Sequence, residues 1–104
     1  MIVVIATNEN NLDAEVALHF GRCGWYCLYF KESQTTEFIE NIDRDKEEKA
    51  GTAAAEFLLG KNISMVVAGR FGSKVVNIFR NNKVQMVIPE TSKNIKEIIN
   101  QINI

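Results

Sequence analysis

Short apolar runs separated by polar segments predict five strands along the chain. Runs of β-branched or aromatic residues are typical of buried strands, and they occur at 2–6, 25–30, 63–68 and 84–88. Residues 38–42 form a more polar run, which predicts a more exposed strand. Because the polar segment 31–37 separates the second run from the third, we expect these two strands to form a hairpin.

Three other segments carry helical patterns. Residues 50–59 are rich in helix formers, and Gly60 stands where a C-cap is expected. Residues 74–80 place apolar side chains on one face and are followed by two asparagines. Thr91 or Ser92 can cap a last helix. Isoleucines repeat there at helical spacing and predict a buried stripe: Ile95, Ile98, Ile99 and Ile102.

The order of these elements predicts an α/β fold. Strands that alternate with helices in the second half imply right-handed parallel crossovers, whereas the first half begins with antiparallel pairing. We therefore expect one mixed five-stranded sheet with three helices on its faces. Counted along the chain, its strand order is 3-2-1-4-5, with strand 2 antiparallel to the others. Residues 1–104 are expected to form a single domain in which the charged segment 43–49 is a solvated connector.

Composition narrows the class of protein. The 104 residues are 46% apolar and 24% charged, as in a soluble globular domain, with a formal net charge of −1 and a pI near 5.8. Nucleic-acid-binding domains usually have a basic patch and a pI above about 9, so we expect no nucleic-acid partner. No apolar run approaches the roughly 20 residues that span a bilayer, so we expect no membrane segment. The first residues lack the basic start of a signal peptide, so we expect a cytoplasmic protein with reduced cysteines.

The predicted topology gathers distinctive residues at the edge of the sheet where the parallel strands end. This edge collects the 7–22 segment, the start of the first helix and the sequence GRFG at 69–72. Open α/β sheets bind ligands at such an edge, and helix N-termini there offer N–H groups and partial positive charge to an anion. Gly21, Gly69 and Gly72 would allow unusual backbone angles or the close approach of a ligand. The candidate binding residues are His19, Phe20, Gly21, Arg22, Gly51, Thr52, Gly69, Arg70, Phe71 and Gly72.

The single histidine and the two cysteines are the residues to consider as metal ligands. His19 can bind an open metal position, although a lone histidine before a strand is often a structural or surface group. On one strand, Cys23 and Cys27 would lie about 13 Å apart, too far for a disulfide or for one zinc ion. We therefore expect Cys27 to be a small buried residue, whereas Cys23 stays a candidate ligand or redox-sensitive thiol. The aromatic residues of 25–30 are expected to pack in the core.

Three blocks of the sequence resemble the dinitrogenase iron–molybdenum cofactor biosynthesis family. The first block, IVVIATNENNLDAEVALHFGRCGWY at 2–26, is similar to the family's opening strand, polar loop and pattern L-D-x-E-V-x-x-H-F-G-R. KAGTAAAEFL at 49–58 is similar to its glycine- and alanine-rich helix start, and VVAGRFGSKVVNIF at 66–79 to its strand–turn–helix. The matched positions are Asp13, Glu15, His19, Phe20, Gly21, Arg22, Gly51, Gly69 and Gly72.

The resemblance implies a ribonuclease-H-like three-layer fold and a short, single-domain form of the nitrogenase accessory factors. It also implies a carrier rather than an enzyme, which binds an iron–sulfur or molybdenum-containing metallocluster, or its precursor, in cofactor biosynthesis. A molybdenum–copper sulfide is a further cargo within this group, and the role of cluster ligand falls on His19. The expected partners are proteins that donate and accept the cluster, and we expect a monomer or weak homodimer.

Two other functions would use the same edge. A regulatory or interaction domain would bind a small anionic metabolite or a partner protein there, because a fold does not fix a function. A nuclease would need several carboxylates around two metal ions about 4 Å apart. The first strand has no carboxylate, and Asp13 and Glu15 alone make a poor metal pair, so the sequence argues against a nuclease.

Overall fold

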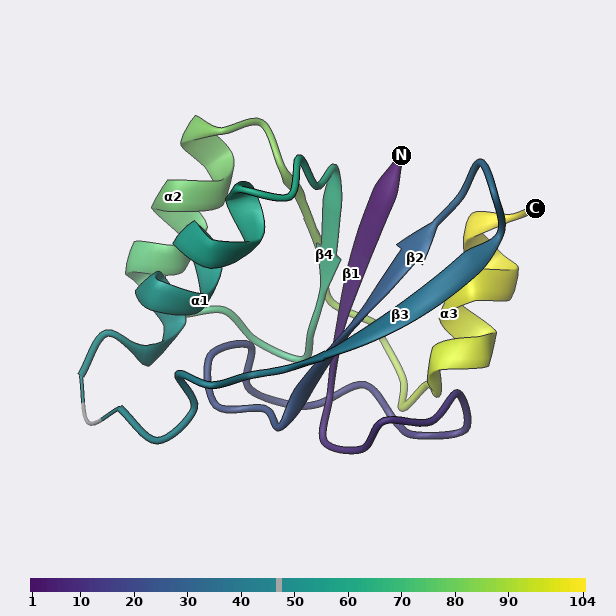
Figure 1. Ribbon diagram of the computed structural model, residues 1–104, viewed down its shortest axis with the longest axis horizontal. Helices are drawn as coiled ribbons and strands as arrows, with labels where there is room; N and C mark the ends of the chain where they lie inside the picture. The colour runs from purple at the N-terminus through teal and green to yellow at the C-terminus, as the bar shows by residue number, and fades with distance from the viewer. Residues whose placement is uncertain (47) are drawn as a thin grey trace.

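The computed structural model describes residues 1–46 and 48–104, which form one sheet with helices on both faces (Figure 1). Glu47, part of the charged segment 43–49, lies outside the described residues. The strands are β1 (Ile2–Thr7), β2 (Trp25–Phe30), β3 (Thr35–Glu40), β4 (Met65–Val67) and β5 (Gln85–Val87). The helices are α1 (Ala50–Leu59), α2 (Ser73–Asn81) and α3 (Ile95–Ile102).

The topology of the sheet is the one predicted. The strand order is β3-β2-β1-β4-β5. β2 pairs antiparallel with both β1 and β3, whereas β1 with β4 and β4 with β5 pair in parallel. Four strands therefore end at the same edge of the sheet, here called the carboxyl edge, and the predicted ribonuclease-H-like arrangement is confirmed.

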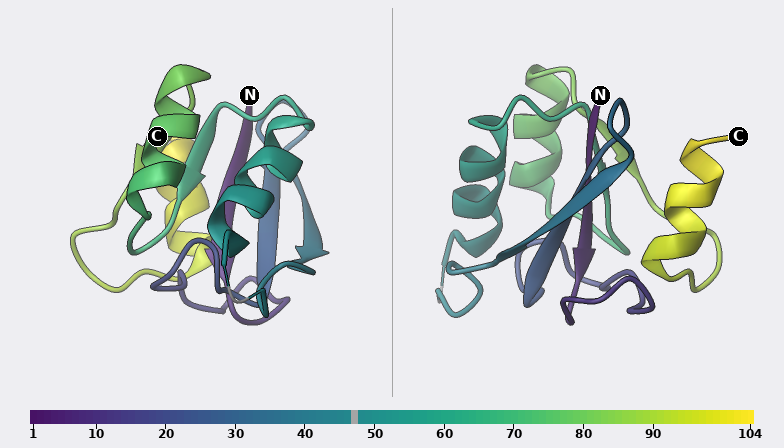
Figure 2. Two further views of the ribbon diagram at one scale, coloured as in Figure 1. Left: turned by 90° about the vertical axis from the view of Figure 1, so that its left-hand side faces the viewer. Right: turned by 45° about the vertical axis from the view of Figure 1, so that its right-hand side comes forward.

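Side chains that alternate along the strands build one core on each face of the sheet. On β2, Tyr26 and Leu28 belong to the core under α1 and α2, whereas Cys27 and Tyr29 belong to the core under α3. Figures 1 and 2 show α1 and α2 side by side on one face and α3 on the other. The isoleucine stripe of α3 packs against the sheet as predicted: Ile95 and Ile98 are buried, and Ile99 and Ile102 are partly buried.

Predicted and observed strand boundaries differ. β3 spans Thr35–Glu40 instead of residues 38–42, because an edge strand tolerates exposed polar residues that an apolar pattern does not register. The reversal occupies only 31–34, where Gln34 takes a φ of 55°. β4 and β5 are shorter than the predicted runs 63–68 and 84–88, since three residues of each form the ladder between them.

The N-cap of α3 also differs from the prediction. Asn94 caps this helix, not Thr91 or Ser92. The Asn94 side chain accepts a hydrogen bond from the Glu97 N–H (2.9 Å), and the Glu97 carboxylate accepts one from the Asn94 N–H (3.1 Å). This capping box satisfies two groups at once, which a single hydroxyl cannot do.

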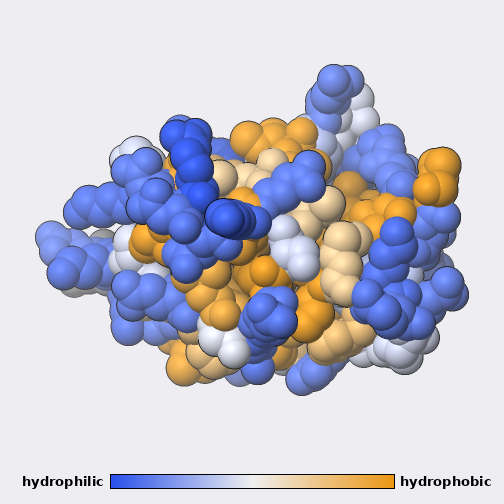
Figure 3. Space-filling view, turned by 90° about the horizontal axis from the view of Figure 1, so that it is seen from above, coloured by the Kyte–Doolittle hydropathy of each residue, from blue (hydrophilic) through white to orange (hydrophobic). Residues whose placement is uncertain are grey.

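The two ends of the sheet differ in character. Figure 3 shows the end at which β1 begins, where polar residues surround a central apolar area. At the opposite end, the carboxyl edge, the 8–24 loop runs beneath the sheet and all three helices begin (Figure 1). No helix in the described part of the chain has the length and apolar character needed to cross a membrane.

Candidate functional site

Backbone hydrogen bonds fix the 8–24 loop along the carboxyl edge. The Ala17 N–H donates to the Ala6 carbonyl (2.7 Å), near the end of β1. The Gly69 N–H donates to the Ala17 carbonyl (2.9 Å), which ties the loop to the turn after β4. The Val16 N–H donates to the Lys93 carbonyl (2.9 Å), in the segment between β5 and α3. The loop therefore joins the end of β1 to the segments that follow β4 and β5.

This loop brings the only imidazole to the turn after β4. A parallel backbone bridge pairs His19 with Arg70, and the Phe20 N–H donates to the Arg70 carbonyl at 3.2 Å. The side chains of His19 and Arg70 are both exposed. The topology predicted that these two residues would meet at one edge, and they do.

Two helices begin at this edge without a side-chain cap. α1 starts after Lys49, whose φ is 63°, and α2 starts after Gly72. Neither has an acidic residue in its first turn, and the Thr52 hydroxyl donates to the Lys49 carbonyl (3.0 Å) instead of acting as a cap. The first N–H groups of both helices can therefore receive an anion. The N-terminus of α3 cannot do so in the same way, because its capping box occupies it.

Two glycines allow backbones to touch at this site. A Cβ on Gly21 would lie 2.5 Å from the Cα of Gly51, so the H-F-G-R turn (residues 19–22) lies directly against the start of α1. A Cβ on Gly69 would lie 2.8 Å from the Cα of Leu18. These contacts are between backbones of the chain itself, and the expected close approach of a ligand stays a prediction. The expected unusual angles are wrong, because none of the glycines has a positive φ, and a Cβ on Gly72 would meet nothing within 4 Å.

Phe20 and Phe71 are packing residues of the candidate site. The Phe20 side chain is 2% exposed, and its ring centroid lies 5.6 Å from that of Phe71 and 5.3 Å from that of Phe79 on α2. It also lies 5.4 Å from the ring of Tyr26 on β2. This aromatic cluster anchors the H-F-G-R turn and the turn after β4 to the same core.

The two predicted cations have different surroundings. One guanidinium nitrogen of Arg22 donates to the carbonyls of Arg44 (3.0 Å) and Lys46. Arg22 thus ties the segment after β3 to the H-F-G-R turn. Arg70 has no hydrogen bond or ion pair from its side chain to any residue that the structure describes, so its charge is available to an anion.

The two cysteines are free, buried thiols. Burial raises the pKa of Cys23, and hydrogen bonds to Tyr26 and to nearby backbone oppose this only in part. Burial raises the pKa of Cys27 from 9.0 to about 12. Both thiols stay protonated near neutral pH, whereas a metal ligand is a thiolate. The Cys23 Sγ lies 3.3 Å from the carbonyl oxygens of Phe20 and Trp25, so it would have to leave the core to reach a ligand.

Sequence reasoning missed the buried amide that supports the H-F-G-R turn. Asn41 is 3% exposed, and its Nδ2 donates to the carbonyls of Gly21 (3.1 Å) and Cys23 (2.9 Å). Its Oδ1 accepts from the Asp43 N–H at 3.1 Å. An asparagine after a polar strand gives no signal of this role, because the carbonyls that it binds lie in a distant part of the sequence.

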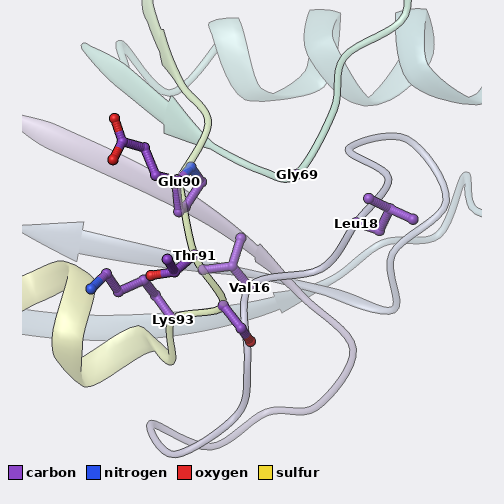
Figure 4. A pocket seen from close by; sticks show the side chains of 8 residues that line it. Val16, Leu18, Gly69, Glu90, Thr91 and Lys93 are labelled. Carbon is purple, nitrogen blue, oxygen red and sulfur yellow. The ribbon is translucent and has the colours of Figure 1, made fainter.

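A pocket lies at the same edge, between the ends of β4 and β5 (Figure 4). It has a volume of about 270 Å³ and is lined by Val16, Leu18, Gly69 and residues 89–93. β4 leads to α2 on one face and β5 leads to α3 on the other, so the pocket lies where neighbouring connections diverge. Figure 4 shows the side chains of Glu90 and Lys93 extending away from Leu18.

The described residues contain no group of three or more histidine, cysteine or acidic side chains placed to hold a metal ion. Of the two carboxylates in the first sequence block, Asp13 pairs with Lys96 on α3 (3.0 Å). Glu15 forms a backbone bridge with Asn94, at the start of the same helix. These contacts join the 8–24 loop to α3.

The fold is that of a small α/β domain whose carboxyl edge gathers an imidazole, an available arginine and two uncapped helix starts in one place. The model of the family described as dinitrogenase iron-molybdenum cofactor matches residues 1–103, and the chain belongs to this family. No curated protein sequence matches the chain.

Solved structures share the fold. The apo form of the orange protein from Desulfovibrio gigas is 16% identical, with a TM-score of 0.90 over 98% of this chain and 86% of that chain. A Thermotoga protein, described as NifB-like and placed in the DUF35 family, is 22% identical, with a TM-score of 0.83 over 98% of this chain and 86% of that chain. At these identities the likeness shows the fold alone.

Proposed function

We propose that the chain is a carrier for a sulfide-containing iron or molybdenum cluster, or for its precursor. The cargo binds at the carboxyl edge, and the chain passes it between a donor and an acceptor protein without catalysis. The observation that supports this most is the pairing of His19 with Arg70 beside two uncapped helix starts. Membership of the family supports the class of cargo.

The groups at the edge suit a sulfide-rich anion. The first N–H groups of α1, near Gly51 and Thr52, and of α2, after Gly72, stabilise negative charge and donate to surface sulfides. The charge of Arg70 adds to this attraction, and the neutral imidazole of His19 can fill one open metal position. A single protein ligand makes a weak attachment, which suits a carrier that must release its cargo.

The same groups suit a bare metal ion poorly. A bare iron or copper ion needs several protein ligands, whereas the described residues offer no such group and both thiols are buried. A cluster brings its own sulfides and needs only one position filled by the protein. The site therefore favours a preformed sulfide cluster over free metal ions.

Anaerobic titration with tetrathiomolybdate, followed by its absorbance, tests this proposal. We expect the wild type to bind tetrathiomolybdate and Arg70→Ala to bind it about tenfold more weakly, as for the loss of one charge-assisted contact. Tetrathiomolybdate has no open metal position, so His19→Ala is tested with a synthetic [4Fe–4S] cluster that has an exchangeable iron position, and we expect it to lose coordination there. Arg80→Ala is the matched control, because it removes an exposed arginine from the last turn of α2, far from the edge. A wild type that binds neither tetrathiomolybdate nor a synthetic [4Fe–4S] cluster contradicts the proposal.

The pocket of Figure 4 favours a second candidate function, in which a regulatory or interaction domain binds a small anionic metabolite. Thr91, Ser92 and Lys93 belong to the pocket lining, and none of their side chains has a hydrogen-bond or ion-pair partner among the described residues. An organic ligand that co-purifies in place of iron, molybdenum or copper would support this function instead.

A further inference from the structure

A buried phenol lies under the H-F-G-R turn. Tyr26 is 1% exposed, and its hydroxyl donates to the Phe20 carbonyl at 2.5 Å. Burial raises the pKa of this phenol well above its usual value of 10.0, so it stays protonated and remains a donor over the physiological range.

This hydrogen bond fixes the orientation of one peptide group. In a trans peptide, a carbonyl and the N–H that follows it point in opposite directions. Because the Phe20 carbonyl points into the core toward Tyr26, the Gly21 N–H points away from that phenol. This N–H has no acceptor among the residues that the structure describes. It belongs to a half-buried residue two positions from His19, against the start of α1.

Neighbouring carbonyls of the turn also bind buried donors. Asn41, which follows β3, donates to the carbonyls of Gly21 and Cys23. The Cys23 thiol lies 3.3 Å from the Phe20 carbonyl, as a second and weaker donor to it. Side chains from β2 and from the end of β3 therefore turn the carbonyls of this segment inward. A turn that presents its N–H groups outward is a common form of anion site.

We propose that Tyr26 is a positioning residue for the cluster site, and that the Gly21 N–H donates a hydrogen bond to a sulfide of the bound cargo. This inference rests on the proposed function, in which the cargo binds beside His19. Tyr26 does not touch the cargo and acts through the Phe20–Gly21 peptide. Without the phenol hydroxyl, the Phe20 carbonyl keeps one donor among the described residues, the weak thiol of Cys23.

The test compares two buried tyrosines of the same strand. Tyr26→Phe removes one oxygen and keeps the ring. Tyr29→Phe is the matched control, because Tyr29 is 2% exposed and its hydroxyl bonds with Asn103 near α3, on the other face of the sheet. In anaerobic tetrathiomolybdate titrations we expect Tyr26→Phe to bind about tenfold more weakly and Tyr29→Phe to bind as the wild type does.

A spectroscopic readout separates positioning from a general loss of packing. In the 15N-labelled wild type, saturating tetrathiomolybdate should shift the Gly21 amide resonance strongly. In Tyr26→Phe this shift should shrink while the shifts at His19 persist. Adding Cys23→Ala to Tyr26→Phe removes the remaining donor to the Phe20 carbonyl and should weaken binding further.

The outcomes distinguish the two proposals. Wild-type affinity in Tyr26→Phe and in the double variant, or an unmoved Gly21 amide in the saturated wild type, overturns the role of Tyr26 and leaves the carrier function standing. An equal loss of affinity in Tyr29→Phe also overturns it. A wild type that binds neither tetrathiomolybdate nor a synthetic [4Fe–4S] cluster overturns the carrier function, and this inference with it.

Discussion

At the scale of single residues, some buried side chains have a higher pKa in the folded chain than in the unfolded chain. Burial is the first cause of the raised pKa values of Cys23, Tyr26 and Cys27. A group whose pKa is raised on folding stabilises the fold below its unfolded value, and this contribution is lost as the pH rises toward the folded value. For Cys27 the loss extends from about pH 9 to about pH 12.

We therefore expect the free energy of unfolding to fall above about pH 9, by at most about 1.4 kcal/mol per pH unit for each group. Urea unfolding at a series of pH values measures this slope. Cys27→Ala should make the slope shallower, because one of the titrating groups is gone. A wild-type stability that stays level up to about pH 11 contradicts the assignment.

The buried amide of Asn41 gives a second prediction at this scale. Asn41→Ala leaves the carbonyls of Gly21 and Cys23 without a donor, so the free energy of unfolding should fall by about 2–4 kcal/mol. Asn82→Ala is the control, because it removes an exposed amide that donates to the Ile78 carbonyl, and it should cost less than about 1 kcal/mol. Equal losses in chemical denaturation would contradict the supporting role of Asn41.

Some residue roles could be predicted from the sequence and others could not. The burial of Cys27 follows from its place in an apolar strand, a local property. The roles of Asn41 and Tyr26 depend on carbonyls in the H-F-G-R turn, which tertiary folding brings to them. No local pattern records such a contact, so sequence reasoning assigned Tyr26 to packing and gave Asn41 no role.

At the scale of elements, the contact of the H-F-G-R turn with α1 depends on the absence of a side chain. Gly21→Ala places a methyl group 2.5 Å from the Cα of Gly51, so we expect a loss of about 1–3 kcal/mol and weaker tetrathiomolybdate binding. Gly72→Ala adds a methyl group in open space at a φ of −68°, and stability should change by less than about 1 kcal/mol. Thermal unfolding compares the two; similar losses contradict this contact.

The start of α3 gives a second prediction at this scale. Asn94→Ala removes one half of the capping box and should cost about 1 kcal/mol. Thr91→Ala should have little effect, because Thr91 does not cap the helix. Urea unfolding of the two variants checks this, and a larger loss in Thr91→Ala would contradict the observed cap.

The order of elements was predictable because strands and helices alternate with different periods. The boundaries of the strands and helices were harder to predict. Thr35 and Thr36 pair in β3 although they are exposed, since main-chain hydrogen bonding at a sheet edge does not require apolar side chains. The same limit applies to α3, where the sequence suggested Thr91 or Ser92 as the cap, whereas the reciprocal contact with Glu97 selects Asn94.

At the scale of the whole molecule, the candidate site is a consequence of topology. His19, Gly51 and Arg70 meet because four parallel strands end at one edge and the 8–24 loop runs along it. This gathering could be predicted from the order of elements alone. The close backbone contact at Gly21 and the pocket beside Gly69 could not be predicted, because both depend on how the loops pack in the folded chain.

The most direct test of a cluster carrier is the content of the protein purified without oxygen from its native host. Elemental analysis and an acid-labile sulfide assay should find iron or molybdenum, with or without copper, together with inorganic sulfide in the wild type. The His19→Ala variant should lose most of both. A wild type that carries an organic ligand and neither metal nor sulfide would contradict the account.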